Sequence, residues 1–179
     1  MTKAKSHHTT HPAADVVVTK QSAAEAIVNK YVPWSMGVGF IPSPLLITAG
    51  VAGIQIKMIS EIGKVYGVPF AENRVKSIVV SLLGGLAPGA LGGLVGGLLS
   101  SIPFIGMWIL PATMPLLGGA STYAIGKVFV QHFESGGTFL SLDAIKAKEL
   151  FAERFEEGKA QASKVAASFN SKLAAVVDI

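Results

Sequence analysis

The fold prediction starts from Ser77–Gly126, SIVVSLLGGLAPGALGGLVGGLLSSIPFIGMWILPATMPLLGGASTYAIG. These fifty residues include no Lys, Arg, Asp, Glu or His. A helix that crosses a bilayer takes about 20 apolar residues, so the stretch accommodates two crossings and a tight turn. We expect the turn at residues 100–103, between arms at 77–99 and 104–126. The sequence therefore predicts an all-α, integral membrane protein with a central Gly- and Pro-rich helical hairpin and amphipathic flanking helices.

The composition of the whole chain favours the same class. Of the 179 residues, 50% are hydrophobic and 15% are charged, whereas soluble domains carry roughly 25% charged residues. The chain has no cysteine, which excludes disulfides and thiolate chemistry. Its formal net charge of +4 is too small and too scattered along the chain to favour nucleic acid as a partner.

Charges on either side of the hairpin predict its orientation. Arg74 and Lys76 precede the first arm and Lys127 follows the second, while the turn is uncharged. This bias predicts that both termini are cytoplasmic. Trp108 near the turn and Tyr123 near the end of the second arm are aromatic residues of the kind found at interfaces. We expect these five residues to mark the membrane interface.

Proline residues interrupt both arms of the hairpin. Pro88 lies in the first arm, Pro111 and Pro115 lie in the second, and Gly118-Gly119 is expected to soften the second arm further. In lipid, such breaks persist only where neighbouring helices satisfy the freed backbone groups. A re-entrant hairpin, which enters and leaves by the same face, is therefore an alternative to a hairpin that crosses.

A ladder of glycines runs along the first arm. Gly85, Gly89, Gly93 and Gly97 recur every four residues, which places them on one face of a helix. Small side chains let helix backbones approach closely in lipid, where the hydrophobic effect does not drive helices together. The ladder predicts a self-association face and hence a homo-oligomer. Packing of the ladder on the second arm of the same hairpin is the alternative.

The segments before the hairpin predict a tail and two helices. Residues 1–20 are expected to be a disordered tail, followed by a membrane-embedded helical domain at 21–138. Within that domain, a capping box predicts a helix at 22–32. The Ser43-Pro44 start and the Gly67 stop predict another helix at 44–66 that dips into the bilayer or lies on its surface.

The segment after the hairpin, residues 139–179, is charged and amphipathic. We expect a break at Gly136-Gly137, a helix from Leu142 onward, and a division of this helix into two at Gly158. The apolar positions recur at helical spacing opposite the Lys and Glu residues. They are Leu142, Ile145, Phe151, Phe155, Val165, Phe169, Leu173 and Val176.

No pattern in the chain predicts catalysis or a cofactor. His7, His8 and His11 could chelate a metal, but they lie in the expected tail and lack nearby carboxylates. An ionisable residue inside the apolar stretch would have pointed to transport or proton relay, and none is present. We therefore expect no enzyme activity, no catalytic or cofactor-binding residue and no metal site.

Five short motifs in sequence resemble the bacterial membrane family called domain of unknown function 697, which includes YcjF-like proteins. The resemblance covers residues 33–143. Its motifs are Ile41-Pro42-Ser43-Pro44, Lys64-Val65-Tyr66-Gly67-Val68-Pro69, the arm rich in Leu and Gly, Ile102-Pro103-Phe104-Ile105-Gly106, and Thr122-Tyr123-Ala124-Ile125-Gly126.

The resemblance implies a membrane module of a kind fused to, or encoded beside, Era-like or dynamin-like GTPases, without an established activity. It also implies that the membrane is the bacterial inner membrane or an internal membrane continuous with it. The chain itself has no nucleotide motif. Leu45 and Leu46 occupy positions where the family commonly has an acidic residue, which makes the helix more apolar and puts any contact made by that acid in doubt.

Two hypotheses for function follow. The first is a non-enzymatic membrane protein that self-associates through its glycine-rich hairpin and acts as a scaffold or shaper of the bilayer. The alternative is a membrane adaptor that recruits or regulates a separate GTPase through its C-terminal helix. A passive pore built from several hairpins is a third interpretation, but few polar residues are available to line it.

Overall fold

Five α-helices make up the described structure. A computed structural model of the chain describes residues 12–41, 43–86 and 106–177. No strand occurs among these residues, so the all-α class is confirmed. The helices are α1 (Pro12–Val38), α2 (Pro44–Tyr66), α3 (Glu72–Leu86), α5 (Gly106–Glu134) and α6 (Ala144–Val177).

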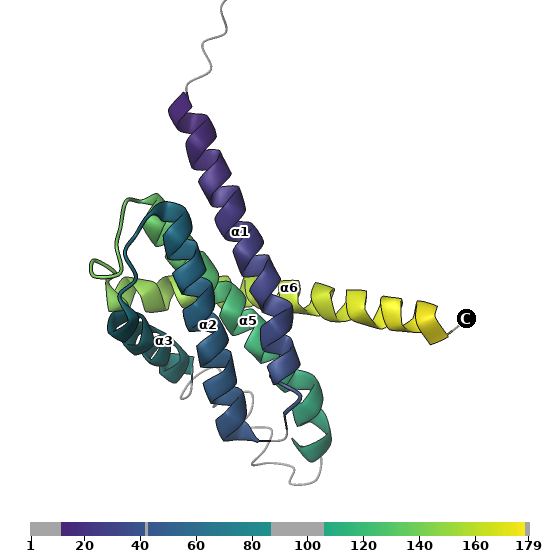
Figure 1. Ribbon diagram of the computed structural model, residues 1–179. Helices are drawn as coiled ribbons and strands as arrows, with labels where there is room; N and C mark the ends of the chain where they lie inside the picture. Colours follow the sequence, from purple (N-terminus) through teal and green to yellow (C-terminus); the bar gives the residue numbers. More distant parts are fainter. Residues whose placement is uncertain (1–11, 42, 87–105, 178–179) are drawn as a thin grey trace, which may run out of the picture.

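Helices α1, α2 and α5 form the body of the bundle (Figure 1). Helix α1 runs opposite to α2 and α5, α3 lies beside α2, and α6 crosses the bundle on the α5 side. The largest side chains that are fully buried between these helices are almost all apolar, which is the hydrophobic driving force for the fold. They are Val28 and Val32 of α1, Met58, Ile59 and Ile62 of α2, Val75, Val79 and Leu82 of α3, Ile125 and Phe129 of α5, and Phe139 of the α5–α6 loop.

Helix α2 confirms the predicted bounds of 44–66. Ser43 is in the extended conformation that precedes a helix, and Pro44 is the first helical residue. Gly67 ends the helix with φ of 75°, and its N–H donates to the carbonyl of Lys64. Glycine takes this left-handed conformation without the steric cost that a Cβ would add.

Helix α1 is longer than the sequence predicts. It begins at Pro12, ten residues before the expected start at Ser22, and it continues through Pro33 to Val38. Proline removes one backbone hydrogen bond from a helix interior. The predicted end before Pro33 is wrong because tertiary packing outweighs that loss: Val32 and Met36, on either side of the proline, are buried between α5 and α6.

Helix α5 also extends beyond the predicted arm. It includes Pro111 and Pro115 and continues past Gly126 to Glu134. The charged Lys127 does not end the helix, because its Nζ donates to Glu25 Oε1 of α1 at 2.6 Å. The residues that follow Lys127 continue the core with four buried side chains, Val128, Phe129, Val130 and Phe133.

The C-terminal segment forms one helix instead of two. The break at Gly136-Gly137 is confirmed, with Gly136 at φ of 80°, and Asp143 Oδ1 accepts the N–H groups of Ile145 and Lys146 at the start of α6. The predicted division at Gly158 is wrong. A Cβ at Gly158 would lie 2.5 Å from the carbonyl oxygen of Ala120, so this glycine allows α6 to cross α5 closely.

The predicted hairpin is described only in part. Its first arm is represented by α3, which ends at Leu86, and its second arm by α5. The turn at 100–103 lies outside the described residues. Among 12–41, 43–86 and 106–177, no helix combines the length and the apolar character needed to cross a bilayer. The prediction of membrane-spanning helices is therefore not supported by this part of the chain.

Candidate functional site

The two uncharged stretches of the sequence meet at one end of the bundle. The first, residues 31–56, spans the end of α1, the connection to α2 and the first half of α2. The second, residues 77–126, includes most of α3 and the first two thirds of α5. The C-terminal end of α1 and the N-terminal ends of α2 and α5 lie together (Figure 1). We call this part of the molecule the uncharged end.

Three lysines bound the uncharged end at a common level. They are Lys30 of α1, Lys57 of α2 and Lys127 of α5, and each is the first charged residue reached on its helix from that end. Hydrogen bonds between Gln55 of α2 and Thr122 of α5 fix the register of two helices. A Cβ at Gly126 would lie 2.6 Å from Val28, which brings α1 into the same register. Lys76 of α3 likewise borders an uncharged stretch, because it is the last charged residue before residues 77–126.

Large apolar side chains are exposed at the uncharged end. Trp34 is 67% exposed, Phe40 is 69% exposed and Leu46 is 57% exposed. Ile41 lies between them in the α1–α2 connection and is also exposed. Scattered single apolar residues are common on protein surfaces, but a group of them marks a site that contacts protein or lipid.

Glycines bring the helices of the uncharged end into close contact. A Cβ at Gly39 would lie 2.6 Å from the backbone nitrogen of Pro115, and one at Gly118 would lie 3.0 Å from the carbonyl oxygen of Ser35. Gly118 and Gly119 were expected to soften α5, but they serve instead as contact points with α1. Packing over small residues is typical of helices that associate in lipid.

A buried polar cluster links the three helices just below the level of the lysines. Gln55 Nε2 donates to Ser121 Oγ and to Thr122 Oγ1, each at 3.2 Å. Thr122 Oγ1 in turn donates to Ser35 Oγ at 2.7 Å. Gln55 Oε1 has no hydrogen-bond partner among the described residues. Side chains of this kind fix helix register in an otherwise apolar core.

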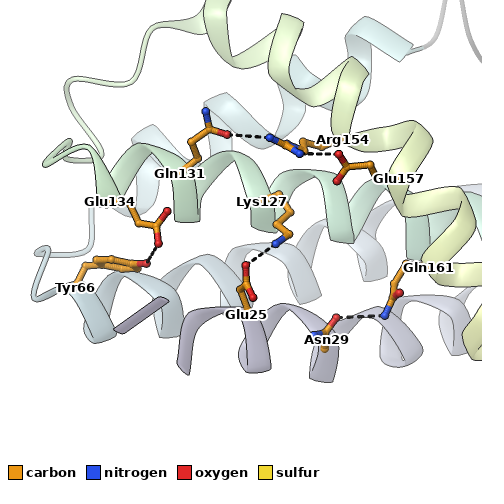
Figure 2. A network of polar contacts seen from close by, with 9 residues as sticks. All are labelled: Glu25, Asn29, Tyr66, Lys127, Gln131, Glu134, Arg154, Glu157 and Gln161. Atoms are coloured by element: carbon orange, nitrogen blue, oxygen red, sulfur yellow. Dashed lines mark hydrogen bonds and ion pairs between the residues drawn. The ribbon is translucent and has the colours of Figure 1, made fainter. Parts of the chain in front are cut away.

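The opposite half of the bundle is rich in charges that pair with one another (Figure 2). Beyond the Glu25–Lys127 pair, Tyr66 Oη donates to Glu134 at 3.5 Å. Arg154 of α6 donates to Glu157 at 2.6 Å and to Gln131 of α5 at 3.5 Å. These contacts leave the molecule polarised, with a charged half and an uncharged end.

A groove lies between α1 and α2 at the boundary of these two halves. It has a volume of about 470 Å³. Its charged rim is formed by Lys30, Lys57 and Glu61, while its remaining walls and floor are mostly apolar. The other lining residues are Tyr31, Trp34, Ala49, Gly50, Gly53 and Ile54.

Hydrogen bonds to Glu61 set the electrostatics of the groove rim. Tyr31 Oη donates to Glu61 Oε1 at 2.7 Å, and Lys30 Nζ donates to Glu61 Oε2 at 3.0 Å. The bond from Tyr31 is the largest cause that lowers the pKa of Glu61 below its ordinary value. Burial and the bond to Glu61 raise the pKa of Tyr31 to about 12. Glu61 is therefore ionised at neutral pH and partly neutralises Lys30.

Removing the Tyr31 hydroxyl should change how stability depends on pH. The pKa of Glu61 is lower in the folded state than its ordinary value. Such a carboxyl stabilises the fold at pH values above its unfolded pKa, and this stabilisation is lost as the pH falls through its folded pKa. We expect Tyr31→Phe to cost about 1 to 2 kcal/mol at neutral pH. In this variant, the free energy of unfolding should also fall less steeply as the pH drops below 4.5, the ordinary pKa of Glu61. Urea unfolding followed by circular dichroism at a series of acidic pH values measures both effects.

The matched control for this change is Tyr66→Phe, which removes a longer hydrogen bond, to Glu134, at the C-terminal end of α2. It should alter the pH slope less than Tyr31→Phe does. Identical slopes for the wild type and Tyr31→Phe would contradict the assigned role of the Tyr31 hydroxyl.

The predicted interface residues do not all gather in one place. Lys127 and Tyr123 lie together, with Lys127 Nζ 5.8 Å from the Tyr123 ring centroid, and both are half-buried between α1 and α5. Arg74 is exposed at the start of α3 and donates to the carbonyl oxygen of Leu142 at 3.3 Å. Lys76 pairs with Glu72 of its own helix. Trp108 lies in the first turn of α5, at the uncharged end.

The predicted glycine ladder is almost entirely outside the described residues. Gly85 lies in the last turn of α3, whereas Gly89, Gly93 and Gly97 fall in the segment that is not described. The close helix contacts in the described part involve other glycines, at positions 39, 50, 118, 119, 126 and 158. The sequence does not reveal these glycines, because they do not recur every four residues and because the residues that they contact lie far away along the chain.

The described residues contain no group of three His, Asp or Glu side chains arranged to hold a metal ion. His7, His8 and His11 lie outside these residues. His132 Nε2 lies 2.9 Å from the carbonyl oxygen of Thr138 in the α5–α6 loop, where that oxygen accepts a hydrogen bond.

The fold and this site together define a class of protein: an all-α bundle divided between a charged half and an uncharged end with exposed apolar side chains. The chain belongs to the family described as Domain of unknown function (DUF697), which matches residues 9–160. It is also similar to a curated protein named Magnetosome membrane protein 22, from Magnetospirillum gryphiswaldense. The two are 37% identical over 162 residues, which cover 90% of this chain and 82% of the relative. No solved structure matches the chain.

Proposed function

We propose that this chain is a non-enzymatic membrane protein that embeds its uncharged end in one leaflet of a bilayer and acts there as a scaffold. The observation that carries the proposal is the meeting of both uncharged stretches at one end of the bundle, bounded by Lys30, Lys57 and Lys127. Lysines at such a boundary keep their charges in the headgroup region while their stems lie along apolar surface. The name of the relative, a magnetosome membrane protein, supports a membrane location.

The uncharged parts of α1 and α2 suit one leaflet in length. Helix α1 rises about 12 Å from Lys30 to Val38 and α2 rises about 20 Å from Pro44 to Lys57, whereas α5 rises about 32 Å from Gly106 to Lys127. The hydrocarbon core is about 30 Å thick, so one leaflet contributes about 15 Å. The uncharged parts of α1 and α2 can therefore pass through one leaflet but not through the whole core. The lengths of these two helices support the re-entrant alternative over a hairpin that crosses.

Orientation and self-association belong to the same proposal. Helix α1 begins at Pro12, on the side of the lysine boundary away from the uncharged end, which supports insertion from the cytoplasmic side. Neighbouring copies would meet in the plane of the membrane through Gly89, Gly93 and Gly97, which lie between α3 and α5 in the sequence. Crosslinking in native membranes tests this: Gly89→Leu with Gly93→Leu should abolish the oligomer, and a strictly monomeric wild type would contradict it.

The two tryptophans of the chain test the insertion without added labels. Trp34 and Trp108 both lie at the uncharged end, and Trp108 lies about 15 Å further from the lysines along α5. With phosphatidylcholine vesicles, we expect emission of both residues to shift to the blue. In Trp108→Phe, lipids brominated near the headgroup should quench Trp34 best. In Trp34→Phe, lipids brominated deep in the acyl chain should quench Trp108 best.

Quenching by aqueous acrylamide provides the control for this experiment. Vesicles should shield both tryptophans from it. If acrylamide quenches both equally well with and without vesicles, the uncharged end does not enter the bilayer and the proposed function is wrong.

One observation favours the adaptor as a second candidate function. The far half of α6 extends beyond the bundle (Figure 1), and Phe169, Leu173 and Val176 are exposed along one face of it. A GTPase could bind this face. A stoichiometric nucleotide-binding protein should then copurify from membranes and be lost in Leu173→Asp but kept in Asn170→Asp. Equal recovery with both variants would contradict this function.

A further inference from the structure

The groove between α1 and α2 has charged residues on one side and apolar residues on the other, an order of polarity that matches a single lipid molecule. Its charged rim, with Lys30 and Lys57, lies at the boundary of the uncharged end. Its walls of Trp34 and Ile54 lie closer to the uncharged end. A membrane lipid has the same order, with a phosphate at the interface and an acyl chain beneath it.

The charges at the rim favour an anion. Lys57 is exposed and forms no ion pair among the described residues, while Lys30 shares its charge with Glu61. The rim therefore carries two cations and one carboxylate, which leaves one positive charge uncompensated. The groove volume of about 470 Å³ lies within the range of small-molecule sites.

One of the glycines that line the groove leaves space beside it unfilled. A Cβ built at Gly53 has no other atom within 4 Å, so this position faces empty space. Gly50, one turn earlier on α2, differs: its Cβ would lie 2.8 Å from Val38, so it serves helix packing. Gly53 thus leaves room in the groove without being needed for the contact between α1 and α2.

We propose that this groove binds the headgroup and upper acyl chain of an anionic phospholipid, with the phosphate at Lys57 and Lys30. The inference rests on the proposed insertion of the uncharged end, which would bring the groove to the depth of the headgroups. Trp34 contacts the chain below the phosphate, and Tyr31 remains bonded to Glu61 at the rim.

The test uses Trp34 in the Trp108→Phe protein as a reporter of vesicle binding. Titrations compare vesicles of phosphatidylcholine alone with vesicles that include phosphatidylglycerol, at constant ionic strength. We expect preference for phosphatidylglycerol in the parent protein and a loss of about fivefold in that preference for Lys57→Gln. Gly53→Leu, which fills the groove, should abolish the preference while binding to phosphatidylcholine persists.

Two matched variants separate a site from general attraction between lysines and anionic vesicles. Lys64→Gln removes the same charge from the same helix about 10 Å further from the uncharged end, about one Debye length away. Gly37→Leu adds the same side chain at another open position, on α1. Both should keep most of the preference for phosphatidylglycerol. Inorganic phosphate should not compete, because the acyl chain contributes to binding.

The outcomes distinguish this inference from the proposed function. If Gly53→Leu keeps the preference, or if Lys64→Gln loses as much as Lys57→Gln, the lipid site is wrong while insertion stands. If inorganic phosphate displaces the protein from phosphatidylglycerol vesicles, the groove binds phosphate alone and the lipid site is again wrong. If no vesicle shifts the emission of Trp34, the proposed insertion itself fails.

Discussion

Phe40→Asp and Leu46→Asp should each lower binding of the protein to vesicles by roughly 100-fold. Both side chains are exposed at the uncharged end, so the substitutions leave the core of the bundle intact. In the inserted state, however, each places a charge in the hydrocarbon region, at a cost of about 2.5 to 3.5 kcal/mol. A tenfold change in an equilibrium corresponds to about 1.4 kcal/mol. Flotation of the protein with phosphatidylcholine vesicles on a density gradient measures the loss.

The control for these substitutions is Leu140→Asp. Leu140 is 75% exposed in the α5–α6 loop, at the end of α5 opposite to the uncharged end. This variant should float with vesicles as the wild type does. If Leu140→Asp reduces flotation as strongly as Phe40→Asp, general surface hydrophobicity drives binding and the uncharged end has no special role.

Gly158→Ala and Gly53→Ala should change stability in opposite directions. Both glycines lie inside helices, where alanine has the higher intrinsic helix propensity by about 1 kcal/mol. At Gly53 the added methyl group meets nothing, so we expect a gain of about 0.5 to 1 kcal/mol. At Gly158 it would lie 2.5 Å from the Ala120 carbonyl oxygen. The two helices must then separate, and overpacking of this kind costs about 1 to 3 kcal/mol.

Urea unfolding of the two variants and the wild type, followed by circular dichroism, gives both signs in one experiment. A larger residue makes the contrast stronger: Gly158→Leu should lose the packing of α6 on α5, while Gly37→Leu, also in open space, should fold normally. Stabilisation by Gly158→Ala would show that α6 does not cross α5 as closely as described.

Local signals in the sequence account for much of the secondary structure. The bounds of α2 follow from the Pro44 start and the Gly67 stop, because these residues have strong backbone preferences of their own. The break at Gly136 is predictable for the same reason. The errors at Pro33 and Gly158 have a different origin. There, a local preference against helix is outweighed by contacts with α5, which lies far away in the sequence.

The candidate site was predictable only in its chemical character. Arg74, Lys76 and Lys127 flank an uncharged stretch of the sequence, and their role at a membrane interface stays a prediction. However, Lys30 and Lys57 were not recognised as part of the same boundary. They bracket a different stretch, and nothing in the sequence says that the two stretches share one end of the molecule. The groove was missed as well, because its lining comes from two helices that run in opposite directions.

Residue types and local spacing are enough to predict that this chain is helical, that two long stretches carry no charge, and that lysines stand at the ends of both. Long-range helix packing, in contrast, brings those stretches to one end through α1, α2 and α5, places the lysines at one level, and opens a groove beside Gly53. The reason is physical: the close contacts of Gly126 with Val28 and of Gly158 with Ala120, together with the hydrogen bonds of Gln55, fix the register between helices.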